Sequence, residues 1–123
     1  MADVDADQVA QVNEVVAASS EYVKQISAAL TAAFHADNDA LAAQLLDKLH
    51  EAIDAKTQAI NLQTVTTVAG LKQAVANFQI TARKLEDQKA QIDHIVQAVG
   101  LAEQVIATIN RIGSEAAVLA AML

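Results

Sequence analysis

Cysteine and proline are absent from this chain of 123 residues, and its three glycines are isolated from one another. Without cysteine, the chain has no disulfide framework, no thiolate nucleophile and no zinc site with cysteine ligands. Without proline, and with alanine as its commonest residue, it contains little that interrupts a helix and much that favours one. These absences predict an all-α fold.

Aromatic residues are also scarce, at 2% of the chain: Tyr22, Phe34 and Phe78. A core must then be built mainly from Val, Ile, Leu and Ala. Small side chains let helix backbones approach closely, but each one buries little apolar area. A single copy would be thinly stabilised, so we expect the chain to associate with itself, as a homo-oligomer, or with another protein.

The net charge of −7 is concentrated in the first half of the chain. Residues 1–54 carry ten acidic residues against Lys24 and Lys48, whereas residues 55–123 carry five acidic and six basic residues. An acidic surface repels nucleic acid phosphates and anionic membranes, so we expect no nucleic acid partner. A basic surface on another protein stays open as a partner.

The start of the sequence, MADVDADQVA, is acidic and lacks the basic and then apolar order of a signal peptide. No run of about 18 apolar residues is present, so we expect no transmembrane segment. The pattern is typical of a cytoplasmic protein, although export without a leader stays open.

Apolar residues recur at steps of three and four in four segments, which predict helices over about 6–36, 39–60, 66–99 and 101–121 of a single domain, 1–123. Asp5 and Gln8 have the spacing of a capping box for the first helix, and Asp39 is the expected N-cap of the second. Gly100 is expected to end the third helix. The predicted fold is an antiparallel four-helix bundle or a set of elongated helical hairpins.

Each predicted helix has an apolar stripe that we expect to face the core or a partner. The first stripe comprises Val9, Val12, Val16, Ser19, Val23, Ile26, Leu30 and Ala33, and the second Ala42, Leu46, Leu49, Ile53 and Ile60, with Leu45 at its edge. The third comprises Leu71, Val75, Phe78, Ala82, Leu85, Ile92, Val96 and Val99, and the fourth Leu101, Val105, Ile109, Ile112, Ala116 and Leu119. The first extends over more than three heptads, as in a bundle or a coiled coil.

Residues 60–70, INLQTVTTVAG, are ambiguous because the apolar phase barely changes across them. They are either a turn between two helices or the middle of one helix of about 60 residues, roughly 90 Å long. We favour the turn, because compact bundles are commoner than such rods.

No motif indicates chemistry. Asp47, His50 and Asp54 are spaced by three and four, but they lie away from the apolar stripe, and the chain contains no Glu-x-x-His pair of the kind that builds di-metal sites in bundles. No serine has the strand–turn–helix context of a nucleophile, and no glycine-rich phosphate loop is present. We therefore expect no catalytic, cofactor-binding or metal-binding residues and no enzymatic activity.

The sequence is typical of a non-enzymatic helical protein that acts through helix–helix self-association, in a homo-oligomer or a larger assembly. The predicted contact residues lie in the first stripe and in the uncharged C-terminal tail: Val9, Val12, Val16, Val23, Ile26, Leu30, Val118, Leu119 and Met122. One alternative is an acidic binding module, an inhibitor or adaptor that covers a basic surface of another protein. A second is an amphipathic coat on a lipid or polymer surface.

Overall fold

The computed structural model describes residues 2–123, which form five α-helices and no β-strand. The helices are α1 (Ala6–His35), α2 (Asp39–Leu62), α3 (Val68–Asp87), α4 (Lys89–Gln97) and α5 (Ala102–Ala121). The all-helical class that the composition predicted is therefore confirmed.

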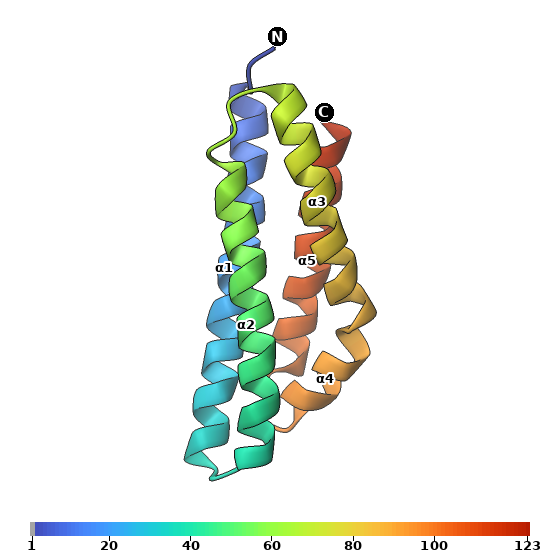
Figure 1. Cartoon of the computed structure of the whole chain (residues 1–123). Helices are drawn as coiled ribbons and strands as arrows, with labels where there is room; N and C mark the ends of the chain where they lie inside the picture. Colours follow the sequence, from blue (N-terminus) through green and yellow to red (C-terminus); the bar gives the residue numbers. More distant parts are fainter. Residues whose placement is uncertain (1) are drawn as a thin grey trace.

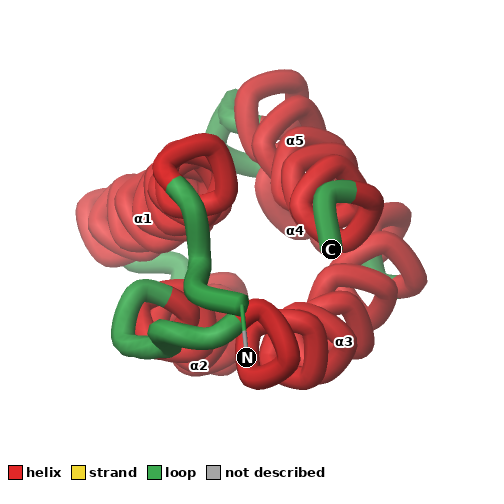
Figure 2. The backbone as a smooth tube through the Cα atoms, turned by 90° about the horizontal axis from the view of Figure 1, so that it is seen from above, coloured by secondary structure: helices red, strands yellow, loops and turns green. Residues whose placement is uncertain are grey.

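The long helices run side by side (Figure 1). Viewed along their length, α1, α2, α3 and α5 surround a common interior, and α4 lies at the end far from both termini (Figure 2). α1 makes its most extensive contacts with α2 and α5, and α3 packs against α5 far more than against α2. The two termini and the α2–α3 connection meet at one end of the molecule.

The start of α1 is fixed by the predicted capping box. The backbone N–H of Gln8 donates to the Asp5 carboxylate at 2.8 Å, and the Asp5 N–H donates to the Gln8 side-chain oxygen at 3.0 Å. This exchange satisfies two backbone donors that a helix start otherwise leaves unpaired. The predicted start of the first helix is confirmed.

The turn between α1 and α2 depends on a left-handed residue. Asp37 has a φ of 53°, and the N–H groups of Asp37 and Asn38 donate back to the carbonyls of Phe34 and Ala33. This is the pairing that closes a helix at a left-handed residue. Asn38 then caps α2, because its side chain accepts from the Leu41 N–H at 3.1 Å. The prediction that Asp39 is the cap is wrong by one residue.

A turn separates α2 from α3, so the single long helix considered for residues 60–70 does not form. Thr67 caps α3 by accepting from the Gly70 N–H at 3.2 Å. Ahead of α1, the backbone of Ala2–Val4 pairs with Thr66–Val68: the Val4 N–H donates to the Thr66 carbonyl and the Val68 N–H donates to the Ala2 carbonyl, both at 3.0 Å. The start of the chain therefore fastens the α2–α3 connection.

The predicted helix over 66–99 is in fact two helices, α3 and α4, which meet at Gln88. Gln88 ends α3 and precedes α4, and no side chain caps α4. The break predicted at Gly100 is confirmed: Gly100 has a φ of 76°, and the Leu101 N–H donates back to the Val96 carbonyl at 3.1 Å. Glycine adopts this conformation without the steric cost that a side chain imposes.

The core is apolar and follows the predicted stripes of the second half of the chain. The buried apolar residues of α3, α4 and α5 are Leu71, Val75, Phe78, Ala82, Leu85, Ile92, Ile95, Val96, Val105, Ile109, Ile112, Ala116 and Leu119, and Thr108 is buried with them. The stripe predicted for α2 is wrong in phase. Its buried face is Leu41, Ala42, Leu45, Ala52, Ala55, Ala59 and Leu62, together with Lys48, whereas Leu46, Ile53 and Ile60 are exposed. The predicted seam of α1 is half right. Val12, Ser19, Ile26 and Ala33 are buried as predicted, whereas Val9 is exposed, Val16, Val23 and Leu30 are half-buried, and the buried face also includes Val15, Ala18, Tyr22 and Ala29.

The N-cap assignment can be tested by stability. Asn38→Ala removes the side-chain acceptor of the Leu41 N–H, so we expect it to lower the free energy of unfolding by about 1 kcal/mol. Asp39→Ala is the matched control and should cost only a few tenths, through the helix dipole. Urea unfolding followed by circular dichroism measures both; a larger loss for Asp39→Ala would contradict the assignment.

Candidate functional site

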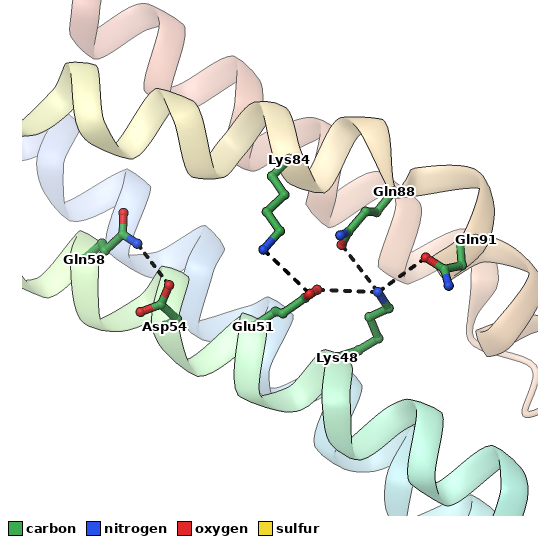
Figure 3. Close-up of polar contacts among 7 residues, drawn as sticks. All are labelled: Lys48, Glu51, Asp54, Gln58, Lys84, Gln88 and Gln91. Atoms are coloured by element: carbon green, nitrogen blue, oxygen red, sulfur yellow. Dashed lines mark hydrogen bonds and ion pairs between the residues drawn. The ribbon is translucent and has the colours of Figure 1, made fainter.

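One charged side chain lies inside the molecule. Lys48 of α2 is only 5% exposed. Its ammonium group lies 3.5 Å from Glu51 Oε2 and donates to the side-chain oxygens of Gln88 and Gln91, each at 3.4 Å (Figure 3). All three contacts are long for charge-assisted hydrogen bonds, which are usually about 2.7–2.9 Å. Lys48 thus connects α2 to the point where α3 gives way to α4.

Glu51 bridges two lysines. Its Oε2 faces Lys48, and its Oε1 lies 3.8 Å from Lys84 Nζ on α3 (Figure 3). The Glu51 side chain is 24% exposed and the Lys84 side chain 62% exposed, so water screens the outer pair more than the inner one. The cluster therefore runs from solvent at Lys84 to the interior at Lys48.

Tyr22 of α1 is fully buried, and its hydroxyl has no hydrogen-bond partner among the described residues. Burial, reinforced by the negative charge of Glu51, raises the pKa of the Tyr22 phenol well above its ordinary value. The phenol stays protonated because its ionised form would be both desolvated and close to a carboxylate. The Ser19 hydroxyl is buried without a partner as well.

These buried groups do not face a large cavity. A hollow of about 110 Å³ beside the cluster is lined by Glu51, Asp54, Thr81, Lys84 and their apolar neighbours, and neither Lys48 nor Tyr22 lines it. A general acid, base or nucleophile must reach its substrate directly or through one water. The geometry of Lys48 is that of a tie between helices.

Two wider grooves lie on the surface. One, of about 370 Å³, runs between α3 and α5 over Gly113 and Ala117, with Arg83 and Glu86 on its α3 side. The other, of about 410 Å³, lies between α2 and α3, where Asn61, Asn77 and Thr81 are among its lining residues. Both grooves are open to solvent. The groove between α3 and α5 is lined by charges of both signs, and the groove between α2 and α3 by no charged residue. Neither groove brings a set of titratable groups together.

The three histidines of the chain are dispersed. His35, His50 and His94 are all exposed and lie on three different helices. Within residues 2–123, no three His, Cys, Asp or Glu side chains are close enough together to hold a metal ion. Across the same residues, no helix is both long enough and apolar enough to span a membrane.

The nine predicted contact residues separate into three groups. Val12, Ile26 and Leu119 lie in the core, Val16, Val23 and Leu30 are half-buried, and Val9, Val118 and Met122 are exposed. The three exposed residues are accessible to a partner, whereas the three half-buried ones also pack against the core. The contact role of all six stays a prediction.

The accessible residues of α1 continue onto α2. We use the name α1–α2 strip for two rows of apolar side chains at heptad spacing: Val9, Val16, Val23 and Leu30 of α1, and Leu46, Ile53 and Ile60 of α2. Leu46 is 44% exposed, Ile53 45% and Ile60 40%. The sequence predicted the four residues of the α1 row as contact residues. It placed the three residues of the α2 row in the second apolar stripe, which was expected to face either the core or a partner.

The polar cluster was missed altogether. Lys48 occupies a position in the buried three-and-four repeat of Leu41, Leu45, Ala52 and Ala55, which was the available signal.

Comparisons with protein-family models, with curated proteins and with solved structures found no match.

The cluster predicts an asymmetry between its two charges. Glu51→Gln leaves the buried Lys48 ammonium without a counter-charge, so we expect a loss of about 2 kcal/mol in the free energy of unfolding. Lys48→Met should change it by less than about 1 kcal/mol, because the remaining Glu51 reaches both water and Lys84. Asp54→Asn, on the exposed side of α2, is the control. Chemical unfolding measures all three, and a larger loss for Lys48→Met would contradict the assignment.

Tyr22 predicts a pH dependence. A phenol whose pKa is higher in the folded than in the unfolded chain contributes stability below about pH 10, which is lost as pH rises further. Tyr22→Phe removes the titrating group, and with it this loss at high pH, and it also removes an unpartnered hydroxyl, so the stability of the variant at pH 7 should be equal or higher. We expect its advantage over the natural chain to widen above pH 10 in urea unfolding. A difference that does not depend on pH would refute the proposed cause.

Proposed function

We propose that this chain is a non-enzymatic helical protein, an antiparallel four-helix bundle, that acts by helix–helix self-association into a homo-oligomer. The observation that carries the proposal is the α1–α2 strip, an apolar surface along the outside of two neighbouring helices. Contiguous apolar patches of more than a few hundred Å² are rare on monomeric proteins and mark interaction sites.

The composition of the exposed surface supports the proposal. Large apolar side chains that are exposed include Val9, Ile53 and Ile60 near the α1–α2 strip and Val118 and Met122 at the end of α5. Of these, Val9, Val118 and Met122 are among the contact residues that the sequence predicted. Exposing such side chains to water costs free energy that association with a second apolar surface recovers.

The buried polar groups support a structural role in preference to catalysis. Lys48 and Glu51 contact residues of the chain itself, and Lys48 holds α2 to the α3–α4 break. A catalytic group needs access to a substrate, whereas a tie between helices needs only its partners.

Light scattering combined with sedimentation velocity tests the proposed self-association on the full chain. We expect a mass of at least two copies at micromolar concentration and an affinity that does not weaken between low and high salt, because the contact is apolar. A monodisperse monomer at high micromolar concentration would overturn the proposal. Binding only to a basic protein, and weakening with salt, would favour the acidic module instead.

A further inference from the structure

We infer that the α1–α2 strip is the contact surface of a two-fold symmetric dimer, in which α1 of each copy lies antiparallel to α2 of the other. The inference rests on the proposed self-association and identifies its surface and its partner, a second copy of this chain. Three features of the surface lead to this partner: the register of its two rows, the distribution of charge around it and its size.

The two rows are in register with each other. Gln63 Nε2 donates to Asn13 Oδ1 at 2.9 Å, which fixes the level of α2 relative to antiparallel α1. Three residues further along α1 and three residues back along α2 are Val16 and Ile60. Two further heptad steps, each about 10.5 Å, give the pairs Val23 with Ile53 and Leu30 with Leu46. The strip is therefore a ladder of three levels, each with one side chain from each helix.

This ladder is complementary to itself. A two-fold axis parallel to the helices keeps every level and exchanges the two columns. Val16 and Val23 then face Ile60 and Ile53 of the second copy, so that each small side chain meets a larger one. Heptad spacing and alternation of size are the features that let side chains of facing helices interdigitate. Two-fold contacts of this kind are the commonest form of homo-oligomer.

Acidic side chains point away from the three levels of the ladder, although Asp39 lies one heptad step before Leu46, at the end of the α2 row. Glu14 and Glu21 lie about 160° around α1 from Val16 and Val23, at 100° per residue. Glu14 instead pairs with Arg111 of α5 at 3.2 Å. On α2, Glu51 pairs with Lys84, and Asp54 accepts from Gln58 at 3.1 Å. A chain with a net charge of −7 can therefore bring the three levels of two copies together without placing carboxylates opposite each other. The exception is the end of the face beyond Leu30 and Leu46, where Asp37 of each copy approaches Asp39 of the other.

The surface is large enough for a dimer. α2 has 24 residues, which corresponds to a length of about 36 Å, and two adjacent helices are about 20 Å wide. The whole face of the two helices is thus on the order of 700 Å², somewhat below the 800 Å² or so that each partner buries in a standard interface. The three apolar levels, from Leu46 to Ile60, cover about 21 Å of its length. Other exposed apolar side chains, such as Ile80 on α3, lie outside this face and belong to no such ladder.

Substitution to a carboxylate tests the surface. Ile53→Glu should weaken dimerisation about 100-fold or more in sedimentation equilibrium, because two unpaired carboxylates would enter an apolar contact. Ile80→Glu is the matched control: it makes the same change at a residue that is 65% exposed on α3, and it should leave the dimer intact. Val118→Glu tests the α5 tail, and circular dichroism reports folding for each variant.

The outcomes separate this inference from the proposed function. A natural chain that stays monomeric at high micromolar concentration overturns both. A dimer that survives Ile53→Glu but dissociates with Val118→Glu overturns the α1–α2 strip and leaves self-association standing. A dimer lost with Ile53→Glu and kept with the other two variants supports the strip.

Cross-linking tests the pairing even if a charged variant unfolds, and the absence of native cysteine makes it specific. A chain carrying Val23→Cys is mixed with a differently tagged chain carrying Ile53→Cys and oxidised mildly. We expect at least a tenfold higher yield of the mixed disulfide than for Val23→Cys with Ile80→Cys, since a disulfide requires Cβ atoms about 4 Å apart. Equal yields, or Val23→Cys pairing mainly with itself, would refute the antiparallel α1–α2 arrangement.

Discussion

The contact between α1 and α2, the most extensive between any two helices of the molecule, is the constraint on which the arrangement of the other side chains depends. Ala18, Ala29 and Ala33 of α1 are fully buried, as are Ala52, Ala55 and Ala59 of α2. Small side chains let two helix axes approach and leave no room between them for a branched residue. Ile53 is adjacent to Ala52 in sequence, so burying the alanine turns the isoleucine about 100° away, toward the outside. The apolar outer face of this helix pair is thus a consequence of its alanine-rich inner face.

The same packing limits what the sequence could predict. The fold class, the capping box at Asp5, the turn after α2 and the break at Gly100 were all predictable, because each depends on local chemistry: few helix breakers, a polar cap or a residue without a side chain. The inward face of α2 was not, because that helix has two adjacent stripes at heptad spacing. Hydropathy favours the stripe of Leu46, Ile53 and Ile60, whereas close packing selects the one with the alanines. In α3 and α5 the two criteria agree, and there the buried residues were predicted correctly except for Thr108.

The polar cluster shows a second limit. Nothing in the sequence near Gln88 resembles a helix break, since neither glycine nor proline is present there. The position of the break coincides with the point where Gln88 and Gln91 accept from Lys48, a residue 40 positions earlier in the chain. A charge inside an apolar repeat is normally assigned to the surface, because burying it is costly unless partners surround it. Two of those partners, Gln88 and Gln91, lie beyond α2, so local sequence does not reveal them, and only Glu51 is a local partner.

The short pairing between Ala2–Val4 and Thr66–Val68 has a mechanical consequence. Thr67 is at once the centre of that pairing and the cap of α3. Tension applied to the beginning of the chain would therefore be transmitted first to the cap of α3, through two backbone hydrogen bonds, and only afterwards to the packed body of the molecule. In a pulling experiment, these two hydrogen bonds would break first, and α3 would begin to unfold from its N-terminal end.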